Sequence, residues 1–135
     1  MLANTVDSRD LPLYRKVELI RGELDKRFPG HKIEIRSWRN KRDEGIWIEW
    51  EDGPSLIEML QTGLRERYGL VFLRLPSCFV TYNRRYSLKA LETTRTDSPY
   101  RSYDYALLAE TSFDPDGKPV HGLLTDTWRD NESGD

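Results

Sequence analysis

Apolar residues recur with helical spacing near the start of the chain. Five of them follow at steps of four, three, four and four residues: Leu13, Val17, Ile20, Leu24 and Phe28. This spacing places the five side chains on one face of an α-helix. Pro12 is suited to a first helical turn, with Asp10 as a candidate N-cap, and Pro29-Gly30 is a stop signal. The pattern predicts a helix over about residues 11–28.

Apolar and polar residues alternate in the next two segments. In residues 32–38, Ile33 and Ile35 alternate with charged side chains, and residues 46–51 repeat the pattern with isoleucines and Trp50. Such alternation is typical of strands with one buried face. The connection between them is short and polar, which favours an antiparallel hairpin.

A turn at Asp52-Gly53-Pro54 leads into a second helical pattern. Ser55 and Glu58 have the spacing of a capping box, and Gly69 is a stop signal, so we predict a helix over residues 55–68. Residues 70–75 and 78–86 are rich in β-branched and aromatic side chains and are expected to be strands. The order α-β-β-α-β-β predicts an α+β fold, an antiparallel sheet with two helices on one face.

The pattern is weaker after residue 88. Residues 103–113 fit a helix or a strand, and we favour a strand because Asp114-Pro115-Asp116-Gly117 is a turn signal before a return strand at 119–125. An extra C-terminal hairpin is therefore possible. We expect one domain over residues 1–128, with its core in residues 11–88, an extension at 89–128 and a flexible acidic tail at 129–135.

Composition agrees with a single folded domain. The chain has 135 residues, and its 11% aromatic content argues against disorder despite 33% charged residues. Cys78 is the only cysteine, so no internal disulfide can form and a reducing cytoplasm is expected. No stretch has the apolar length of a signal peptide or a membrane span, so we expect no membrane partner.

Charge is distributed unevenly along the chain. Residues 1–103 hold 19 Lys and Arg against 15 Asp and Glu, a net of +4, whereas residues 104–135 hold 2 against 8, a net of −6. The sum of −2 excludes a uniformly basic nucleic-acid-binding protein. It leaves room for a basic body that joins an acidic C-terminal segment.

Basic and aromatic residues gather at the first predicted hairpin and at the end of strand 78–86. They form a candidate binding surface of nine residues: Arg36, Trp38, Arg39, Lys41, Arg42, Trp47, Arg84, Arg85 and Tyr86. Guanidinium groups beside aromatics suit phosphates and bases, or an acidic protein partner. A solvated sheet face with Arg stems over Trp rings is the simpler explanation. Alternation puts Trp38 and Trp47 opposite the isoleucines, where a second layer covers them or they stay exposed.

The sequence offers little support for catalysis. His31 and His121 lack metal-ligand spacing, and the strand around Cys78 indicates a buried thiol rather than a nucleophile. Glu49 and Glu51 fit a carboxylate pair, but exposed alternation explains them more simply. We therefore expect no catalytic residue, no metal and no cofactor. A small hydrolase would need a pocket that gathers Glu49, Glu51 or His31.

Four short motifs together resemble one known family. They are Phe28-Pro29-Gly30, Ile35-Arg36-Ser37, Trp50-Glu51-Asp52-Gly53-Pro54 and Arg84-Arg85-Tyr86-Ser87. In order and placement, over about residues 17–88, they look like the large polyvalent protein-associated domain, the variety numbered 29. The chain departs from that pattern in its charged hairpin tip and in a shortened segment before Arg84.

The resemblance implies an accessory protein of a phage, plasmid or conjugative element, located in the cytoplasm of a bacterial host cell. It brings no catalytic residues with it. Our prediction is therefore a non-catalytic protein that binds a host macromolecule, first of all a host protein such as a defence effector, with the acidic C-terminal segment occupying a basic groove of that partner. The alternative is nucleic-acid binding by the basic and aromatic hairpin surface. The sequence leaves the oligomeric state undetermined.

Overall fold

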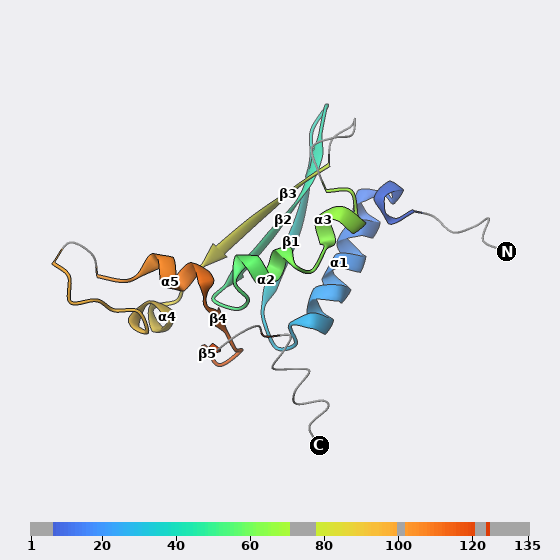
Figure 1. Ribbon diagram of the computed structural model, residues 1–135. Helices are drawn as coiled ribbons and strands as arrows, with labels where there is room; N and C mark the ends of the chain where they lie inside the picture. The colour runs from blue at the N-terminus through green and yellow to red at the C-terminus, as the bar shows by residue number, and fades with distance from the viewer. Residues whose placement is uncertain (1–6, 71–77, 100–101, 121–123, 125–135) are drawn as a thin grey trace, which may run out of the picture.

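A computed structural model describes residues 7–70, 78–99, 102–120 and 124. It is an α+β structure with a three-stranded sheet and a separate two-stranded hairpin, so the predicted fold class is confirmed. Helices α1, α2 and α3 lie on one face of the larger sheet (Figure 1). The predicted tail at 129–135 lies outside the described residues.

The first predicted helix is α1, Leu13–Arg27, and its apolar face is buried at Leu13, Ile20 and Leu24. Its N-cap is Pro12, not Asp10, because Asp10 belongs to the preceding 3-10 turn, Ser8–Asp10. The helix ends before Pro29, as the Pro-Gly signal predicts.

The predicted hairpin is also present. Strand β1, Ile33–Arg39, pairs antiparallel with β2, Glu44–Glu51, in a register that sets Ile35 opposite Ile48. At the turn, the side-chain oxygen of Asn40 accepts hydrogen bonds from the backbone N–H groups of Arg42 and Asp43, at 2.8 and 2.7 Å. This Asx-type bonding closes the polar connection without apolar residues.

The second predicted helix is broken in two. Helix α2, Leu56–Leu60, has Ser55 as its N-cap, and α3, Leu64–Arg67, starts after Gly63. Gly63 has a φ of 74°, a left-handed conformation that glycine adopts without a steric penalty. The apolar spacing continues across the break, so periodicity alone predicts one helix where there are two.

The last strand of the main sheet runs in the direction opposite to the prediction. Strand β3, Cys78–Arg85, pairs with β2 in parallel, with Ile46 beside Val80 and Ile48 beside Tyr82. The order is β1-β2-β3, so α2 and α3 belong to a crossover rather than to a hairpin connection. The expected antiparallel pairing therefore holds for β1 and β2 only. The predicted strand at 70–75 lies almost wholly outside the described residues.

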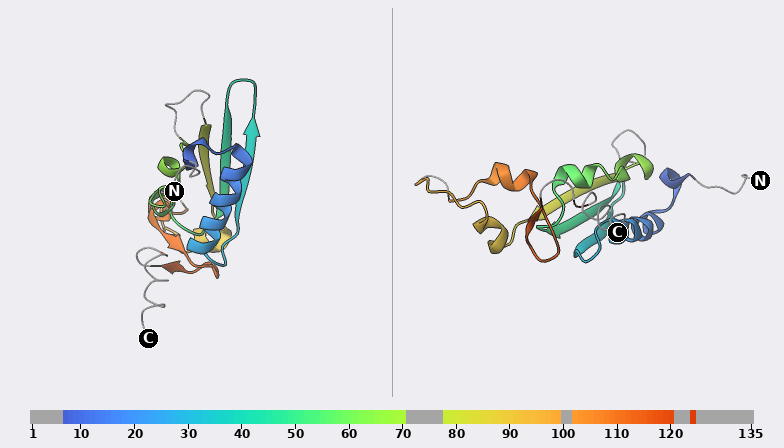
Figure 2. Two further views of the ribbon diagram at one scale, coloured as in Figure 1. Left: turned by 90° about the vertical axis from the view of Figure 1, so that its right-hand side faces the viewer. Right: turned by 60° about the horizontal axis from the view of Figure 1, so that its bottom comes forward.

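One face of this sheet carries the main core. The isoleucines of β1 and β2 and the indole of Trp50 pack against α1, Met59 of α2 and Leu64 of α3. Trp50 is 1% exposed, and its ring nitrogen donates to the Pro54 carbonyl at 2.9 Å. Most of the residues of this core lie between residues 11 and 88, and Leu124 joins them. Figure 2 shows the helices on the same side of the sheet from two further directions.

The chain beyond residue 87 forms a second, smaller unit. Helices α4, Leu88–Glu92, and α5, Tyr105–Glu110, precede β4, Ser112–Phe113, and β5, Pro119–Val120. The strand predicted for residues 103–113 is wrong over 105–110, because Asp104 caps a helix by accepting from the Leu107 N–H. The predicted turn at Asp114 and the C-terminal hairpin are confirmed, since β4 and β5 pair antiparallel.

Candidate functional site

The pleat of the sheet divides the nine candidate residues. Alternation directs Arg36, Trp38, Trp47 and Arg85 to the face opposite the core, which we call the outer face. Arg84 points to the core side, and Arg39, Lys41 and Arg42 lie at the hairpin tip. The structure therefore brings together four of the nine residues and separates the rest.

Trp47 lies at the centre of the outer face. It sits in the middle strand, between Arg36 of β1 and Thr81 of β3 in the register. Its side chain is 40% exposed, and no described element covers it. The sequence left open whether a second layer covers Trp47. Among the described residues none does, because the C-terminal unit packs elsewhere. An exposed tryptophan among polar neighbours is typical of an interface centre.

Trp38 is held more tightly than Trp47. Its ring stacks on Phe79 of β3, with centroids 6.1 Å apart and an interplanar angle of 11°. Gly45 lies between the two residues in the register, and a Cβ there would overlap the Trp38 indole. The glycine thus allows one aromatic ring to cross the middle strand and reach the other.

A substitution pair tests this packing. Gly45→Ala is expected to displace the Trp38 ring and lower the free energy of unfolding by about 1–3 kcal/mol, because the added methyl overpacks the site. Urea unfolding and near-UV circular dichroism measure the two effects. Gly22→Ala, in α1 with no atom within 4 Å of the new Cβ, is the control and is expected to raise stability by up to about 1 kcal/mol. Equal stability of Gly45→Ala and the native chain would contradict the prediction.

Charges on the outer face balance. The face and its lower end carry three basic and three acidic side chains: Lys32, Arg36, Arg85, Glu34, Glu49 and Glu51. Arg36 pairs with Glu34 at 3.0 Å, and Arg85 approaches Glu49 to 3.8 Å. At the tip, Arg39 pairs with Glu44 at 3.0 Å. Arg36, Arg39 and Arg85 of the expected basic patch therefore have carboxylate neighbours, whereas Lys41 and Arg42 at the tip form no ion pair with a described residue.

Arg84 and Tyr86 do not belong to an exposed surface. The guanidinium of Arg84 donates to the carbonyls of Asp52, Gly53, Leu108 and Thr111, at 2.7, 3.2, 3.1 and 2.6 Å. Its carbon lies 4.9 Å from the centre of the Tyr86 ring, which packs against the smaller core. Burial lowers the pKa of Arg84 from its ordinary value. Arg84 thus joins the two units. It lies on the same face of β3 as Val80 and Tyr82, so strand alternation could have indicated that its side chain points to the core side.

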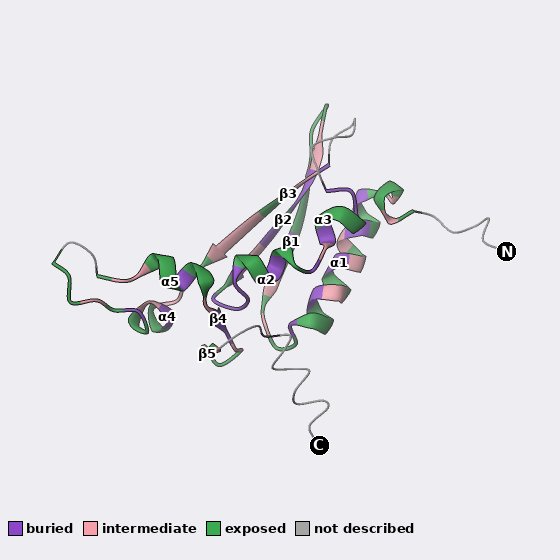
Figure 3. Ribbon diagram, viewed as in Figure 1, coloured by how far each residue is buried: buried purple, intermediate pink, exposed green. Residues whose placement is uncertain are grey.

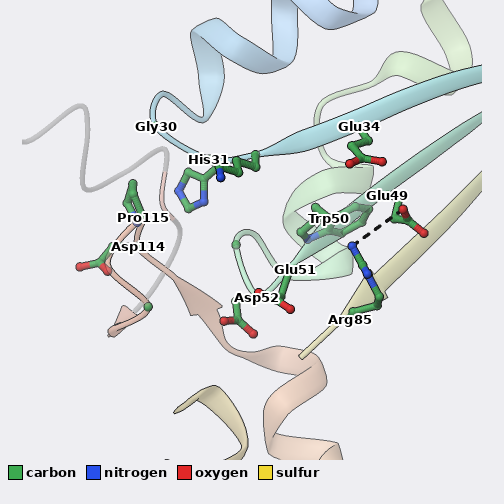
Figure 4. A pocket seen from close by; sticks show the side chains of 13 residues that line it. Gly30, His31, Glu34, Glu49, Trp50, Glu51, Asp52, Arg85, Asp114 and Pro115 are labelled. Atoms are coloured by element: carbon green, nitrogen blue, oxygen red, sulfur yellow. Dashed lines mark ion pairs between the residues drawn. The ribbon is translucent and has the colours of Figure 1, made fainter. Parts of the chain in front are cut away.

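A cavity of about 320 Å³ opens at the lower end of the outer face (Figure 4). Its walls come from the α1–β1 turn, the end of β2, Arg85 and the Asp114 turn. It gathers His31, Glu49 and Glu51, the three residues that a hydrolase was expected to need. The turn at residues 114–117 also lines the cavity, which was not predicted because no local sequence pattern links that turn to β2.

The cavity residues are not assembled as an acid–base pair. His31 and Asp114 lie on one side in Figure 4, and Glu49 with Arg85 lies on the other. Burial lowers the pKa of His31, which favours the neutral ring at pH 7. Glu49 accepts from the Asn83 amide at 2.9 Å. Within the described part of the chain the lining contains no serine, threonine or cysteine.

Two other predictions about chemistry can be compared with the structure. Cys78 is buried, at 6% exposure, and burial raises the pKa of its thiol, which agrees with the predicted unreactive side chain. Among the described residues, no three His, Cys, Asp or Glu side chains are grouped as metal ligands. His121 lies outside the described residues.

The described helices include none that combines the length and the apolar character needed to cross a membrane. Comparison of the chain with protein-family models, with curated proteins and with solved structures finds no match. The resemblance to the large polyvalent protein-associated domain therefore stays a prediction.

Proposed function

We propose that this chain is a non-catalytic protein that binds another protein through the outer face of its sheet. The observation that carries the proposal is Trp47, 40% exposed at the centre of the middle strand, with Arg36 and Thr81 on either side in the register. The stacked Trp38 and Phe79 rings lie in the next row of the same face. A buried aromatic anchor inside a polar rim is the usual arrangement of binding energy in protein interfaces.

The charge balance favours a protein over a nucleic acid as partner. Nucleic-acid binding draws most of its strength from basic groups that neutralise phosphates. On the outer face, Arg36 and Arg85 already have carboxylate neighbours in Glu34 and Glu49. A partner of mixed charge can exchange these pairs across an interface, whereas the balanced face offers a polyanion no net positive charge.

We further propose that the partner is a host protein and that the chain serves a mobile element. The motif resemblance over residues 17–88 supports this context. A catalytic role has less support, because the cavity that gathers His31, Glu49 and Glu51 has no hydroxyl or thiol among its described lining residues and no acid–base pair in contact.

Site-specific photo-crosslinking tests the proposal. A benzoylphenylalanine at position 81, beside Trp47, is expected to give one dominant protein adduct in a lysate of the organism that encodes the chain. The control places the same group at Tyr14, which is 70% exposed on α1. Adding Trp47→Ala is expected to weaken binding of that partner by about 30-fold, the effect of an interface centre worth about 2 kcal/mol. The same adducts from positions 81 and 14, or an adduct insensitive to Trp47→Ala, would contradict the proposal.

The nucleic-acid alternative has its own outcome. Anisotropy of fluorescein-labelled single- and double-stranded DNA and RNA oligonucleotides is measured at low and physiological salt. Absence of binding at low salt removes the alternative. Binding that falls steeply with salt and disappears in Trp47→Ala would replace the protein-binding proposal, because phosphate contacts and base stacking both act through that face.

A further inference from the structure

Exposed apolar side chains concentrate on a surface that the proposed function does not use. Helix α2 has only five residues, yet Leu56, Ile57 and Leu60 are 43%, 55% and 39% exposed, while Glu58 and Met59 face inward. The outer side of this helix therefore carries no charged residue. Figure 3 shows both exposed and buried positions on α2. A solvent-facing helix normally places polar residues there, so a contiguous apolar side marks an interaction surface.

A groove runs beside this helix. It has a volume of about 410 Å³, and its walls include Leu56 and Leu60 of α2, Val80 and Tyr82 of β3, Leu70 and Arg65. Tyr82, in the wall of this groove, also has an unsatisfied polar group. Among the buried side-chain oxygens and nitrogens of the described residues, only the Tyr82 hydroxyl lacks a hydrogen-bond partner. Such orphaned groups are rare in native interiors.

Helix α2 carries both a wall of the groove and an exposed apolar side chain outside it. Leu56 and Leu60 line the groove, while Ile57 is the most exposed of the three and is not among the described lining residues. In a twofold dimer each copy offers the same patch, so Ile57 of one chain can enter the groove of the other, twice. One helix thus supplies both halves of the contact.

The charges at the rim complement themselves in the same way. Arg65 lines the groove and Glu66 follows it on α3, and neither side chain forms an ion pair within the described chain. One basic and one acidic group, both unpaired, give two reciprocal salt bridges when a twofold axis relates two copies. A foreign partner would need to match this arrangement by chance.

We propose that the α2–β3 groove is a homodimer interface, with Ile57 of each chain in the groove of the other and Arg65 opposite Glu66 of the second copy. Helix α2, which forms one wall of the groove, lies on the face of the sheet opposite the outer face that carries Trp47 (Figure 1). The groove also reaches Phe79, at the edge strand β3. The dimer therefore leaves both outer faces accessible and presents two copies of the binding surface. Bivalent presentation strengthens binding to a partner that is itself repeated.

Sedimentation equilibrium of the full chain over about 1–500 µM tests the proposal, a range in which a dimer with a dissociation constant in the micromolar region dissociates. The mass is expected to rise from 15.9 kDa toward twice that value. Ile57→Asp is expected to weaken the dimer at least about tenfold, because it places a charge in an apolar contact. Leu88→Asp, at another exposed leucine, is the matched control and should leave the dimer unchanged.

A charge swap checks the reciprocal arrangement. Arg65→Glu and Glu66→Arg are each expected to weaken the dimer about tenfold, and the double swap to restore it, because the pair reforms with opposite signs. These rim variants keep the test valid if Ile57→Asp fails to fold. A monomer at every concentration overturns the proposal. So does a dimer that Trp47→Ala abolishes, since it would then form through the outer face.

Discussion

Arg84→Ala is expected to lower the free energy of unfolding by about 3 kcal/mol, although Arg84 was first predicted as a surface binding residue. Its guanidinium donates to four carbonyls from both units of the chain. Removing it leaves those oxygens without their charged donor, and two of them, on Leu108 and Thr111, anchor the end of α5. The C-terminal unit should therefore loosen first.

Urea unfolding measures the loss, and hydrogen exchange locates it in residues 105–113. Arg85→Ala is a close control, since Arg85 is the next residue, faces the outer side and has a side chain that is 57% exposed. Its stability should change by less than about 0.5 kcal/mol. Arg84→Lys should behave more like Arg84→Ala than like the native chain, because one ammonium group cannot reach four carbonyls. Equal losses for Arg84→Ala and Arg85→Ala would show that the contacts to the carbonyls contribute nothing.

The contrast between Arg84 and Arg85 shows what alternation can and cannot predict. Alternation assigned the isoleucines of β1 and β2 to the core and left Trp47 outside, and both assignments are correct. Applied strictly to β3, it also separates the two arginines. The prediction grouped Arg84 and Arg85 as one basic cluster because they are adjacent in the sequence. Adjacent residues of a strand point to opposite faces, so the two side chains cannot share one surface.

Other errors in the predicted fold have different causes. Side-chain alternation is the same for parallel and antiparallel strands, so it could not show that β3 runs alongside β2. One helix was predicted where there are two because the spacing of apolar residues carries no information about the left-handed conformation of Gly63. In residues 105–110 the Asp104 cap and the run of alanine and leucine favoured a helix, but the strong turn after residue 113 dominated the interpretation.

The candidate surfaces also differ in how far the sequence could predict them. The outer face follows from local alternation, so most of it was within reach of the sequence. The groove beside α2 and the cavity at the Asp114 turn each join segments far apart in the chain, and no local pattern encodes such a meeting. Leu56, Ile57 and Leu60 of α2 are apolar in the sequence, but composition alone does not show that these three are exposed while Met59 is buried.

Glu58→Ala is expected to lower the free energy of unfolding by about 3 kcal/mol and to detach the C-terminal hairpin. Glu58 is 2% exposed, and its Oε1 accepts from the Ser112 hydroxyl at 2.8 Å and from the Leu124 N–H at 3.0 Å. The same Ser112 hydroxyl oxygen accepts from the Ser55 N–H at 2.9 Å. The Glu58 N–H donates directly to the Ser55 hydroxyl at 3.2 Å, as a capping box requires. The reciprocal half, from the Glu58 carboxylate to the Ser55 N–H, runs through the Ser112 hydroxyl.

We call the chain of hydrogen bonds from Ser55 through Ser112 to Glu58 the relay. A double-mutant cycle distinguishes the loss of this relay from a simple loss of packing. Ser112→Ala alone is expected to cost about 2 kcal/mol, because it unpairs the buried Ser55 N–H. If the relay acts as one unit, the loss in Glu58→Ala/Ser112→Ala falls short of the sum of the single losses by about 1 kcal/mol. Asp25→Ala, at an exposed carboxylate on α1, is the control and should change stability by less than about 0.5 kcal/mol. Additive losses, or unchanged amide protection at residues 112–120 in Glu58→Ala, would mean that the hairpin is held to α2 by its apolar contacts alone.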